Sequence, residues 1–317
     1  MLLFIDFSSI ESIQILNSNF NNMNFTFHQL KIFLEVIRHQ NITKAAEEMY
    51  MTQPALSIQL KNFQKQFDIP LVEKVGKKIQ LTDFGKSIAQ IAKNILNEAE
   101  ELKYKTKEYE GLLTGKLRIS SASTGKYVIP YYLSGFVHEF PGIDLTLDVS
   151  NRTTVIKQLQ NNEIDFALVS VLPEKLDTDE EVLLENKLYL IGDTEKIIKS
   201  RPLIYREQGS ATRNAMSMYF HKSTKRKSIE LTSNEAVKQA VVAGLGYSII
   251  PLIGMSNELK NKDIYIIPSK GLPILTYWRL IWLKNKKLSP VASAYLDFIR
   301  KEKEAIIKKH FGWYVDF

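Results

Sequence analysis

Cysteine is absent from this chain of 317 residues. Its absence excludes disulfide bonds, thiolate catalysis and sulfur-ligated metal sites. Long hydrophobic runs are absent too: no stretch approaches the ~20 apolar residues of a membrane span, so we expect no membrane partner. The apolar N-terminal stretch carries Asp6 and Glu11 and lacks an initial positive charge and a small-residue cleavage site, which argues against a signal peptide.

Signatures of catalysis are also missing. The five histidines are scattered, and no two of them have the spacing of metal ligands: His28, His39, His138, His221 and His310. The chain contains no nucleophile elbow, Walker loop or dinucleotide-binding glycine motif. Gly244 and Gly246 form a G-x-G pair, but inside an apolar run such a pair more often permits tight packing. We therefore expect no enzyme activity, no metal and no cofactor.

Positive charge is in excess. The formal net charge is +7 and the isoelectric point is near 9.2, which suits a polyanionic partner. The length is sufficient for two or three domains of roughly 100–200 residues.

The segment from Thr43 to Phe67 predicts two short helices joined by a tight turn. Thr52 can cap the second helix, and Pro54 suits its first turn because a proline nitrogen lacks the N–H that would be unsatisfied there. Apolar residues at spacings of four, three and four give this helix one buried stripe: Leu56, Leu60, Phe63 and Phe67. The opposite side carries small polar and cationic residues, as a recognition helix in the DNA major groove requires.

A basic hairpin is predicted directly after this helix. Leu71 to Thr82 contains two short runs of alternating apolar residues around a tip with two lysines, and such a wing can touch phosphate. The candidate DNA-binding residues are Thr43, Gln53, Pro54, Ser57, Ile58, Lys61, Lys77 and Lys78. The alternative is an ordinary small helical domain with solvated lysines.

A continuous helical pattern without proline runs from Thr82 to about Leu113. Its apolar positions recur close to a coiled-coil repeat: Phe84, Ile88, Ile91, Ile95, Leu102 and Tyr109. Such a rod cannot bury its own stripe, which favours a dimer seam over a helix packed on its own domain.

The second half of the chain alternates between strand and helix patterns. We expect strands at 117–121, 143–149 and 166–171, with helices at 128–140 and 153–160, hence a parallel sheet with covering helices. A second block runs from about Leu188 to Ile267, with a strand at 202–205. A strand at 275–283 is expected to return to the first lobe and to precede a helix at 290–300. Ligands of such folds bind in the cleft at the carboxyl ends of the strands.

Three polar segments are expected at this cleft. The first follows the first strand and contains Ser121, Ser123, Thr124 and Lys126, and the second contains Asn151 and Arg152. The third, in the other lobe, contains Gly209, Ser210, Thr212 and Arg213; Asn234 is a further candidate. Hydroxyls, helix N-termini and two-pronged arginines favour an anion. Each segment alone is equally consistent with a capped helix start.

The motifs named above resemble those of the LysR-type transcriptional regulators. The resemblance extends from about Phe25 to about Phe298 and rests on Gln29-Leu30, Phe33, Thr43 to Ala46, Thr52 to Ser57 and Leu81 to Gly85. Where the family usually has Leu-Phe and Arg, this chain has Leu71-Val72 and Lys74, and Ile58 stands where arginine is frequent. Asn151-Arg152, Gly209 to Arg213 and Ser233 to Lys238 look most like the subgroup that controls carbon-fixation (RuBisCO) operons.

This resemblance implies an α + α/β fold with an N-terminal winged helix-turn-helix, a long linker helix and a two-lobed, periplasmic-binding-protein-like α/β effector domain. The implied partners are double-stranded DNA with an inverted-repeat operator, a small anionic effector with phosphorylated metabolites among the candidates, and further copies of the chain in a homodimer or homotetramer. The implied location is the cytoplasm. The alternative is a small-molecule-binding α/β protein or transferase without DNA-regulatory activity.

The expected domain borders follow from these patterns. They are an N-terminal extension at 1–22 that is disordered or mis-started, a DNA-binding domain at 23–82, a linker helix at 83–114, an effector domain at 115–300 and a C-terminal tail at 301–317. Within the effector domain, lobe I comprises 115–173 and 273–300, and lobe II comprises 174–272. The aromatic residues near the end are expected either to pack on a neighbouring subunit or to fray.

Overall fold

The computed structural model describes residues 24–76, 78–109, 113–198, 200–220 and 226–315, and within 101–109 only the side chains of Leu102 and Tyr104. The expected extension at 1–22 therefore lies outside the described residues. The chain divides into two compact units, Met1–Lys103 and Tyr104–Phe317, and each is considered by itself. In the described part of the chain, no helix is both long and apolar enough to cross a membrane.

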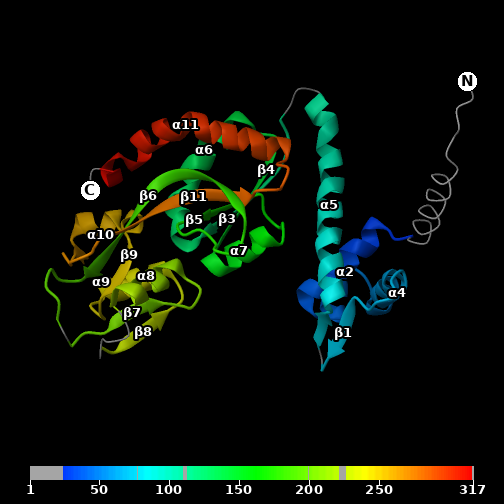
Figure 1. Ribbon diagram of the computed structural model, residues 1–317, viewed down its shortest axis with the longest axis horizontal. Coiled ribbons are helices and arrows are strands. Elements are labelled where there is room, and N and C mark those ends of the chain that lie inside the picture. The colour runs from blue at the N-terminus through cyan, green and yellow to red at the C-terminus, as the bar shows by residue number, and fades with distance from the viewer. Residues whose placement is uncertain (1–23, 77, 110–112, 199, 221–225, 316–317) are drawn as a thin grey trace, which may run out of the picture. The chain divides into compact units, whose positions relative to one another are not determined.

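The N-terminal unit is a winged helix-turn-helix (Figure 1). Its elements are α2 (Phe27–His39), α3 (Ile42–Glu48), α4 (Gln53–Gln64), β1 (Val72–Val75), β2 (Lys78–Leu81) and the first part of α5 (Asp83–Tyr109). The three short helices have side-chain caps: Thr26, Asn41 and Thr52 each accept a hydrogen bond from a backbone N–H of the first turn. These caps explain why each helix begins where it does.

The core of this unit is built from the predicted stripe. Leu56, Leu60 and Phe63 of α4 are buried against Phe33 and Ala45 of the two preceding helices. Helix α4 ends at Gln64, so Phe67 packs on the same core from the turn beyond it. Pro54 is the second helical residue, one position later than the sequence suggests, because Gln53 already has helical geometry.

The apolar stripe of α5 is divided between two surroundings. Phe84, Ile88 and Ile95 pack on the core of the N-terminal unit. Ile91 and Leu102 are 52% and 70% exposed. The expected seam therefore consists in part of residues that are partly buried against their own domain, and Ile91 and Leu102 are the most exposed of the predicted positions whose side chains are described.

The C-terminal unit contains a seven-stranded mixed sheet, with the strand order β10-β6-β11-β5-β3-β4 and β9 paired with β6. Its strands are β3 (Gly115–Ala122), β4 (Ile143–Ser150), β5 (Phe166–Val169), β6 (Thr178–Gly192), β9 (Ser248–Pro251), β10 (Tyr265–Ile266) and β11 (Ile274–Leu283). A separate parallel pair consists of β7 (Leu203–Arg206) and β8 (Ser228–Leu231). Only β4, β3 and β5 form the expected parallel block, because β11 is antiparallel to both β5 and β6.

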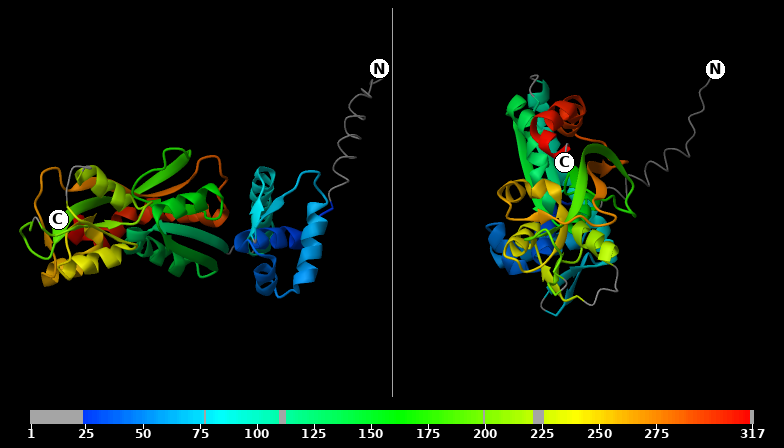
Figure 2. Two further views of the ribbon diagram at one scale, coloured as in Figure 1. Left: turned by 90° about the horizontal axis from the view of Figure 1, so that it is seen from below. Right: turned by 90° about the vertical axis from the view of Figure 1, so that its left-hand side faces the viewer.

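Helices cover both faces of this sheet. These elements are η1 (Ser123–Tyr127), α6 (Ile129–Glu139), α7 (Arg152–Gln160), α8 (Ala211–Phe220), α9 (Asn234–Val242), η2 (Leu252–Gly254), α10 (Ser256–Asn261) and α11 (Pro290–Val315). In β5, Phe166 and Leu168 pack in one core with residues of α6 and α11, whereas Ala167 and Val169 pack in another with residues of α7. Figure 2 shows helices on both sides of the strands. Burial on both sides explains the unbroken apolar sequence of this strand.

Strand β6 is the largest departure from the sequence expectation. It spans 15 residues; its first part pairs with β11, and Leu188 to Ile191 pair with β9. The sequence hides its first half because Asp179, Glu180 and Glu181 interrupt the apolar pattern. The structure accounts for two of them, since Glu180 pairs with Arg279 and Glu181 with Arg300.

The expected tail at 301–317 is also different in the structure. Helix α11 continues without a break to Val315, and both Phe311 and Tyr314 are buried within their own chain. The Tyr314 hydroxyl accepts a hydrogen bond of 2.8 Å from the backbone N–H of Lys187. The described part of this aromatic segment therefore neither frays nor needs a neighbouring subunit to cover Phe311 and Tyr314.

Replacing Phe311 by alanine should lower the free energy of unfolding by about 3–5 kcal/mol, the usual cost of removing a buried ring. Lys309→Ala, an exposed change on the same helix, should stay within about 0.5 kcal/mol. Denaturant unfolding of the two full-length variants measures both values. Equal stability of the two variants would contradict the packing of the tail on its own domain.

Candidate functional site

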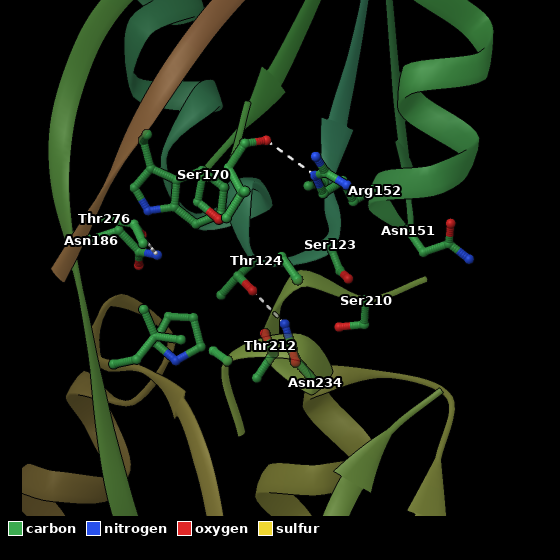
Figure 3. A pocket seen from close by; sticks show the side chains of 17 residues that line it. Ser123, Thr124, Asn151, Arg152, Ser170, Asn186, Ser210, Thr212, Asn234 and Thr276 are labelled. Carbon is green, nitrogen blue, oxygen red and sulfur yellow. Dashed lines mark hydrogen bonds between the residues drawn. The ribbon is translucent and has the colours of Figure 1, made fainter. Parts of the chain in front are cut away.

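A small cavity lies between the two lobes of the C-terminal unit, where β3, β4 and β7 end. Its volume is about 40 Å³. Among the predicted effector residues, those that line it are Ser123, Thr124, Asn151, Arg152, Ser210, Thr212 and Asn234 (Figure 3). Segments far apart in the sequence thus meet at one place, because parallel strands deliver their following loops to the same edge.

Side chains bridge the two lobes across this cavity. Asn234 donates a hydrogen bond from its Nδ2 to the Thr124 hydroxyl, and Figure 3 draws the two side chains pointing at each other. Arg206 Nη2 donates to the Ser123 hydroxyl at 3.1 Å. These contacts hold the lobes in a closed arrangement, and the small volume of the cavity follows from that closure.

Two arginines at the cleft differ in their charge balance. Arg206 is 2% exposed and pairs through both Nε and Nη2 with the carboxylate of Glu207. Arg152 instead donates to the backbone oxygens of Val171 and Leu172, at 3.1 and 2.7 Å, and no described carboxylate pairs with it. Arg152 therefore contributes a positive charge that the described part of the protein leaves uncompensated.

Several buried polar atoms around the cavity have no hydrogen-bond partner among the described residues. They are Asn186 Oδ1, Asn234 Oδ1, Trp278 Nε1 and, behind Ser123, Arg206 Nη1. Buried polar groups are nearly always paired in folded proteins, so unpaired ones at a cavity are available to a ligand. Of those that line the cavity, Trp278 Nε1 can only donate, which suits an oxygen of an anion, and the two amide oxygens can accept from a hydroxyl of a ligand.

Four predicted effector residues do not line this cavity. Ser121 is buried and donates its hydroxyl proton to the oxygen of Ala122. Lys126 lies at a different cavity, where its ammonium is 5.0 Å from the ring centre of Tyr127. Gly209 lies beside the cleft with a φ of +86°.

Arg213 is the fourth of these residues. Its Nη1 donates to the backbone oxygen of Arg206 and to the carboxylate of Glu230, each at 2.5 Å. The guanidinium thus supports the end of β7 and does not reach the cavity. Both bonds come from Nη1, and Arg213 is not among the residues that line the cavity.

Sequence reasoning missed the four other lining residues that have a polar side-chain atom: Ser170, Asn186, Thr276 and Trp278. Asn186 and Thr276 face each other on the paired strands β6 and β11, and Asn186 Nδ2 donates to Thr276 Oγ1 at 2.9 Å. Asn186 is 1% exposed. An amide side chain within a buried strand could have marked Asn186 as a ligand-binding residue. That inference required the knowledge that β6 begins at Thr178 and contains Asn186.

The predicted DNA-binding residues in α4 lie on its outer side. Gln53, Ser57 and Lys61 are four residues apart, and Gln53 Nε2 donates to the Ser57 hydroxyl at 3.0 Å. Ile58 is 59% exposed, and Thr43, Pro54 and Lys61 are also exposed. Lys78 is exposed at the start of β2, whereas Lys77 lies outside the described residues.

The fold and the site together define a DNA-binding protein with a separate two-lobed ligand-binding domain. Residues 27–86 match the model of the lysR family of bacterial regulatory helix-turn-helix proteins, and residues 110–304 match that of the LysR substrate binding domain. The chain belongs to the LysR family of transcriptional regulators.

The relatives that match nearly the whole chain are named as transcriptional regulators. The chain is 36% identical over 296 residues to the transcriptional activator CmpR of Synechocystis, with 89% of this chain and 97% of that protein covered. It is 33% identical to the RuBisCO operon transcriptional regulator of Allochromatium vinosum, over 88% and 97% of the two chains. These relatives are named as regulators, in agreement with the prediction that the chain is not an enzyme.

Solved structures agree with the fold. The regulatory domain of Synechocystis CcmR, solved in complex with 2-PG, is 32% identical and has a TM-score of 0.55, covering 60% of this chain and 98% of that one. Full-length CbnR in complex with its target DNA has a TM-score of 0.62 at 18% identity, covering 87% and 99% of the two chains. The CbnR likeness supports the fold alone.

Gly209 gives a test of the closed cleft. A Cβ at this position would lie 2.6 Å from Thr153 Oγ1 of the opposite lobe, in a backbone conformation that costs other residues about 1–2 kcal/mol. Gly209→Ala should therefore destabilise the protein. Adding Thr153→Ala should remove the destabilisation caused by the steric contact but not that caused by the backbone conformation. Thermal unfolding of the single and double variants measures this coupling. Strict additivity would mean that the two lobes do not meet at Gly209.

Proposed function

We propose that this LysR-type regulator responds to a small phosphorylated carboxylate, with 2-PG (2-phosphoglycolate) as the representative ligand, bound between the lobes of its effector domain. The observation that carries the proposal is the uncompensated guanidinium of Arg152 at a closed polar cavity. Arg152 is only partly buried, so water can solvate its charge, and an anionic ligand that replaces this water gains a charge-assisted hydrogen bond.

The polarity of the cavity narrows the ligand class. A volume of about 40 Å³ is far below the ~300–1,000 Å³ of ligand pockets, so the closed cavity has room for a few water molecules and a ligand enters when the lobes separate. Hydroxyl groups of Ser123, Thr124, Ser210 and Thr212 line the cavity, together with the donor Trp278 Nε1. Several donors around one cavity suit an anion with several oxygens. The CcmR domain that was solved with 2-PG supports the same class.

The proposed DNA contacts divide into two kinds. Gln53, Ser57 and Lys61, with Thr43, Pro54 and Ile58 beside them, meet the base edges, and Lys78 and Lys77 of the wing meet phosphate. Ile91 and Leu102 of α5 contribute to a seam between copies of the chain. A homodimer, or a homotetramer as a pair of dimers, then reads an inverted repeat with half-sites about 34 Å apart in the cytoplasm.

Effector binding is proposed to act through the bridges between the lobes. The ligand enters when the bonds of Asn234 to Thr124 and of Arg206 to Ser123 open, and it replaces them with its own contacts. The equilibrium between lobe arrangements shifts by the difference in ligand affinity between them. The linker helices transmit this shift to the spacing of the DNA-binding units, which changes DNA bending and access of RNA polymerase.

The proposed separation of phosphate contacts from base contacts predicts different outcomes for two variants. Lys78→Ala should weaken binding to operator and random DNA alike and reduce the slope of log affinity against log salt by about 0.9. Ser57→Ala should instead reduce the preference for operator by about 0.5–1.5 kcal/mol, the usual contribution of one neutral hydrogen bond. Titrations of the full-length protein on DNA from upstream of its own gene, at several salt concentrations, measure both. Lys309→Ala controls for the loss of a surface charge, and identical behaviour of the two test variants would refute the division.

The effector site predicts a loss of binding without a loss of DNA affinity. Arg152→Ala should weaken 2-PG binding about 10-fold or more, since hydrogen bonds to charged groups are worth about 1.5–3 kcal/mol. Operator affinity in the absence of 2-PG should change less than about twofold. Calorimetry and DNA titration measure the two quantities. Arg300→Ala, which removes an exposed arginine of α11, is the matched control and should bind 2-PG normally.

The proposal fails if wild-type protein does not bind 2-PG, or if Arg152→Ala binds it as tightly as wild type does. A response to 2-PG that survives Arg152→Ala would place the effector elsewhere.

A further inference from the structure

A second and larger cavity lies in the C-terminal unit, formed in part by the end of α11. Its volume is about 380 Å³, within the ~300–1,000 Å³ typical of ligand pockets. We name it the tail cavity and define it by Lys126, Tyr127, Tyr131, Lys238, His310 and Trp313. None of these residues lines the cleft described above.

The wall contributed by α11 lies beyond the matched LysR domain, which ends at residue 304. It is nevertheless firmly held. The Phe311 ring is 1% exposed and packs edge-on against Tyr131, with ring centres 5.2 Å apart. Tyr314 is fully buried and bonded to the backbone of Lys187. His310 and Trp313 are therefore carried on a fixed support at the mouth of the cavity.

The charged groups around the tail cavity balance one another. Lys238 is buried, and its ammonium lies 2.6 Å from the carboxylate of Glu258 and 3.2 Å from that of Glu235, so these three groups together carry one negative charge in excess. Lys126 is exposed, and no described carboxylate pairs with it; its ammonium lies over the Tyr127 ring instead. Lys126 offsets the excess negative charge of the other three groups, and its ammonium is the one with which an acidic group of a ligand can pair.

Aromatic rings form one part of the lining of the tail cavity, and polar residues form another: Ser256, Asn257 and Glu258. Tyr131 and His310 lie with ring centres 4.8 Å apart at an angle of 34°, and Trp313 is 36% exposed beside them. Exposed flat rings gain most from a flat ring placed against them, worth about 0.5–1.5 kcal/mol per pair beyond burial. One free ammonium next to several open rings matches a planar ring that carries one acidic group.

Two elements are shared between the tail cavity and the cleft. In η1, Thr124 faces the cleft and Tyr127 faces the tail cavity; in α9, Asn234 faces the cleft and Lys238 the tail cavity. The Tyr127 hydroxyl donates a bond of 2.9 Å to Glu235, and burial together with this bond raises the pKa of Tyr127 well above its usual value. Tyr127 therefore remains a donor, and the two elements are tied together on both sides.

We propose that the tail cavity is a second ligand site, which takes a planar aromatic or heteroaromatic ring bearing one carboxylate or phosphate. The acidic group pairs with Lys126, and the ring lies against Tyr131, His310 and Trp313. The site has other lining residues than the proposed effector site, and its occupancy is coupled to the cleft through η1 and α9.

Two probes separate the sources of this chemistry: indole-3-acetate as an aromatic carboxylate and adenosine monophosphate as a heteroaromatic phosphate. Full-length protein is titrated with each by calorimetry. At least one probe should bind one site per chain with a Kd of about 1 mM or tighter. Saturating 2-PG should leave that stoichiometry unchanged. Whichever probe binds identifies the acidic group that the site accepts.

Three variants assign the binding to the tail cavity. Lys126→Ala and Trp313→Ala should each weaken the probe at least about fivefold, because each removes one half of the proposed recognition. Lys309→Ala, an exposed lysine of α11 outside the cavity, should bind as wild type does. Unchanged circular dichroism and melting temperature establish that each variant is folded.

Absence of saturable binding by both probes would overturn the proposal. So would equal binding by wild type, Lys126→Ala and Trp313→Ala, because the probe would then lie elsewhere. These outcomes do not depend on whether 2-PG binds in the cleft, so a failure of the proposed effector and a failure of the second site are distinguishable.

Discussion

The effector domain depends on one antiparallel pair of strands, β6 and β11. Their pairing runs from Ile274 opposite Leu188 to Leu283 opposite Thr178. The register shifts once, between Trp278 and Arg279. The far end of β6 then pairs with β9 of the other lobe. Because one strand belongs to both lobes, the loops after β3 and β4 on one side and after β7 on the other are held face to face. The polar cavity is a consequence of that pairing.

The pairing also explains which parts of the site the sequence could predict. Ser123, Thr124, Asn151, Arg152, Ser210 and Thr212 follow strands directly, and residues after parallel strands gather at one edge whatever the remaining fold. Asn186, Thr276 and Trp278 lie inside β6 and β11, and their presence at the cavity depends on a register that sequence patterns do not contain. The charged start of β6 concealed the strand itself. Sequence patterns thus predicted the cleft residues that lie in loops after strands and missed those that lie within β6 and β11.

The two arginines of the third segment illustrate the same limit. Arg213 follows Gly209 and Ser210 in the sequence, and its guanidinium is of the kind that binds anions. In the structure, however, its Nη1 donates to Glu230 and to the backbone oxygen of Arg206. Arg206 ends β7 and points into the interior, where Glu207 neutralises it. Neither guanidinium lines the cavity. The direction of each is set by the element that carries it and by the neighbouring carboxylate, and a local sequence pattern contains neither. The DNA-binding unit was easier, because a capped amphipathic helix such as α4 reveals its inner and outer sides by spacing alone.

The pairing of cations with carboxylates connects the two cavities of the effector domain. Arg206 and Lys238 are both buried, and each has its carboxylate within hydrogen-bond distance. Arg152 and Lys126 stand at the mouths of the cleft and the tail cavity, and neither has a described carboxylate partner. A buried cation needs a carboxylate partner for the fold to be stable. A cation at the mouth of a cavity is solvated by water until a ligand takes the place of that water. The paired cations therefore stabilise the lobes, and those without a described carboxylate partner mark where an anion gains most by binding.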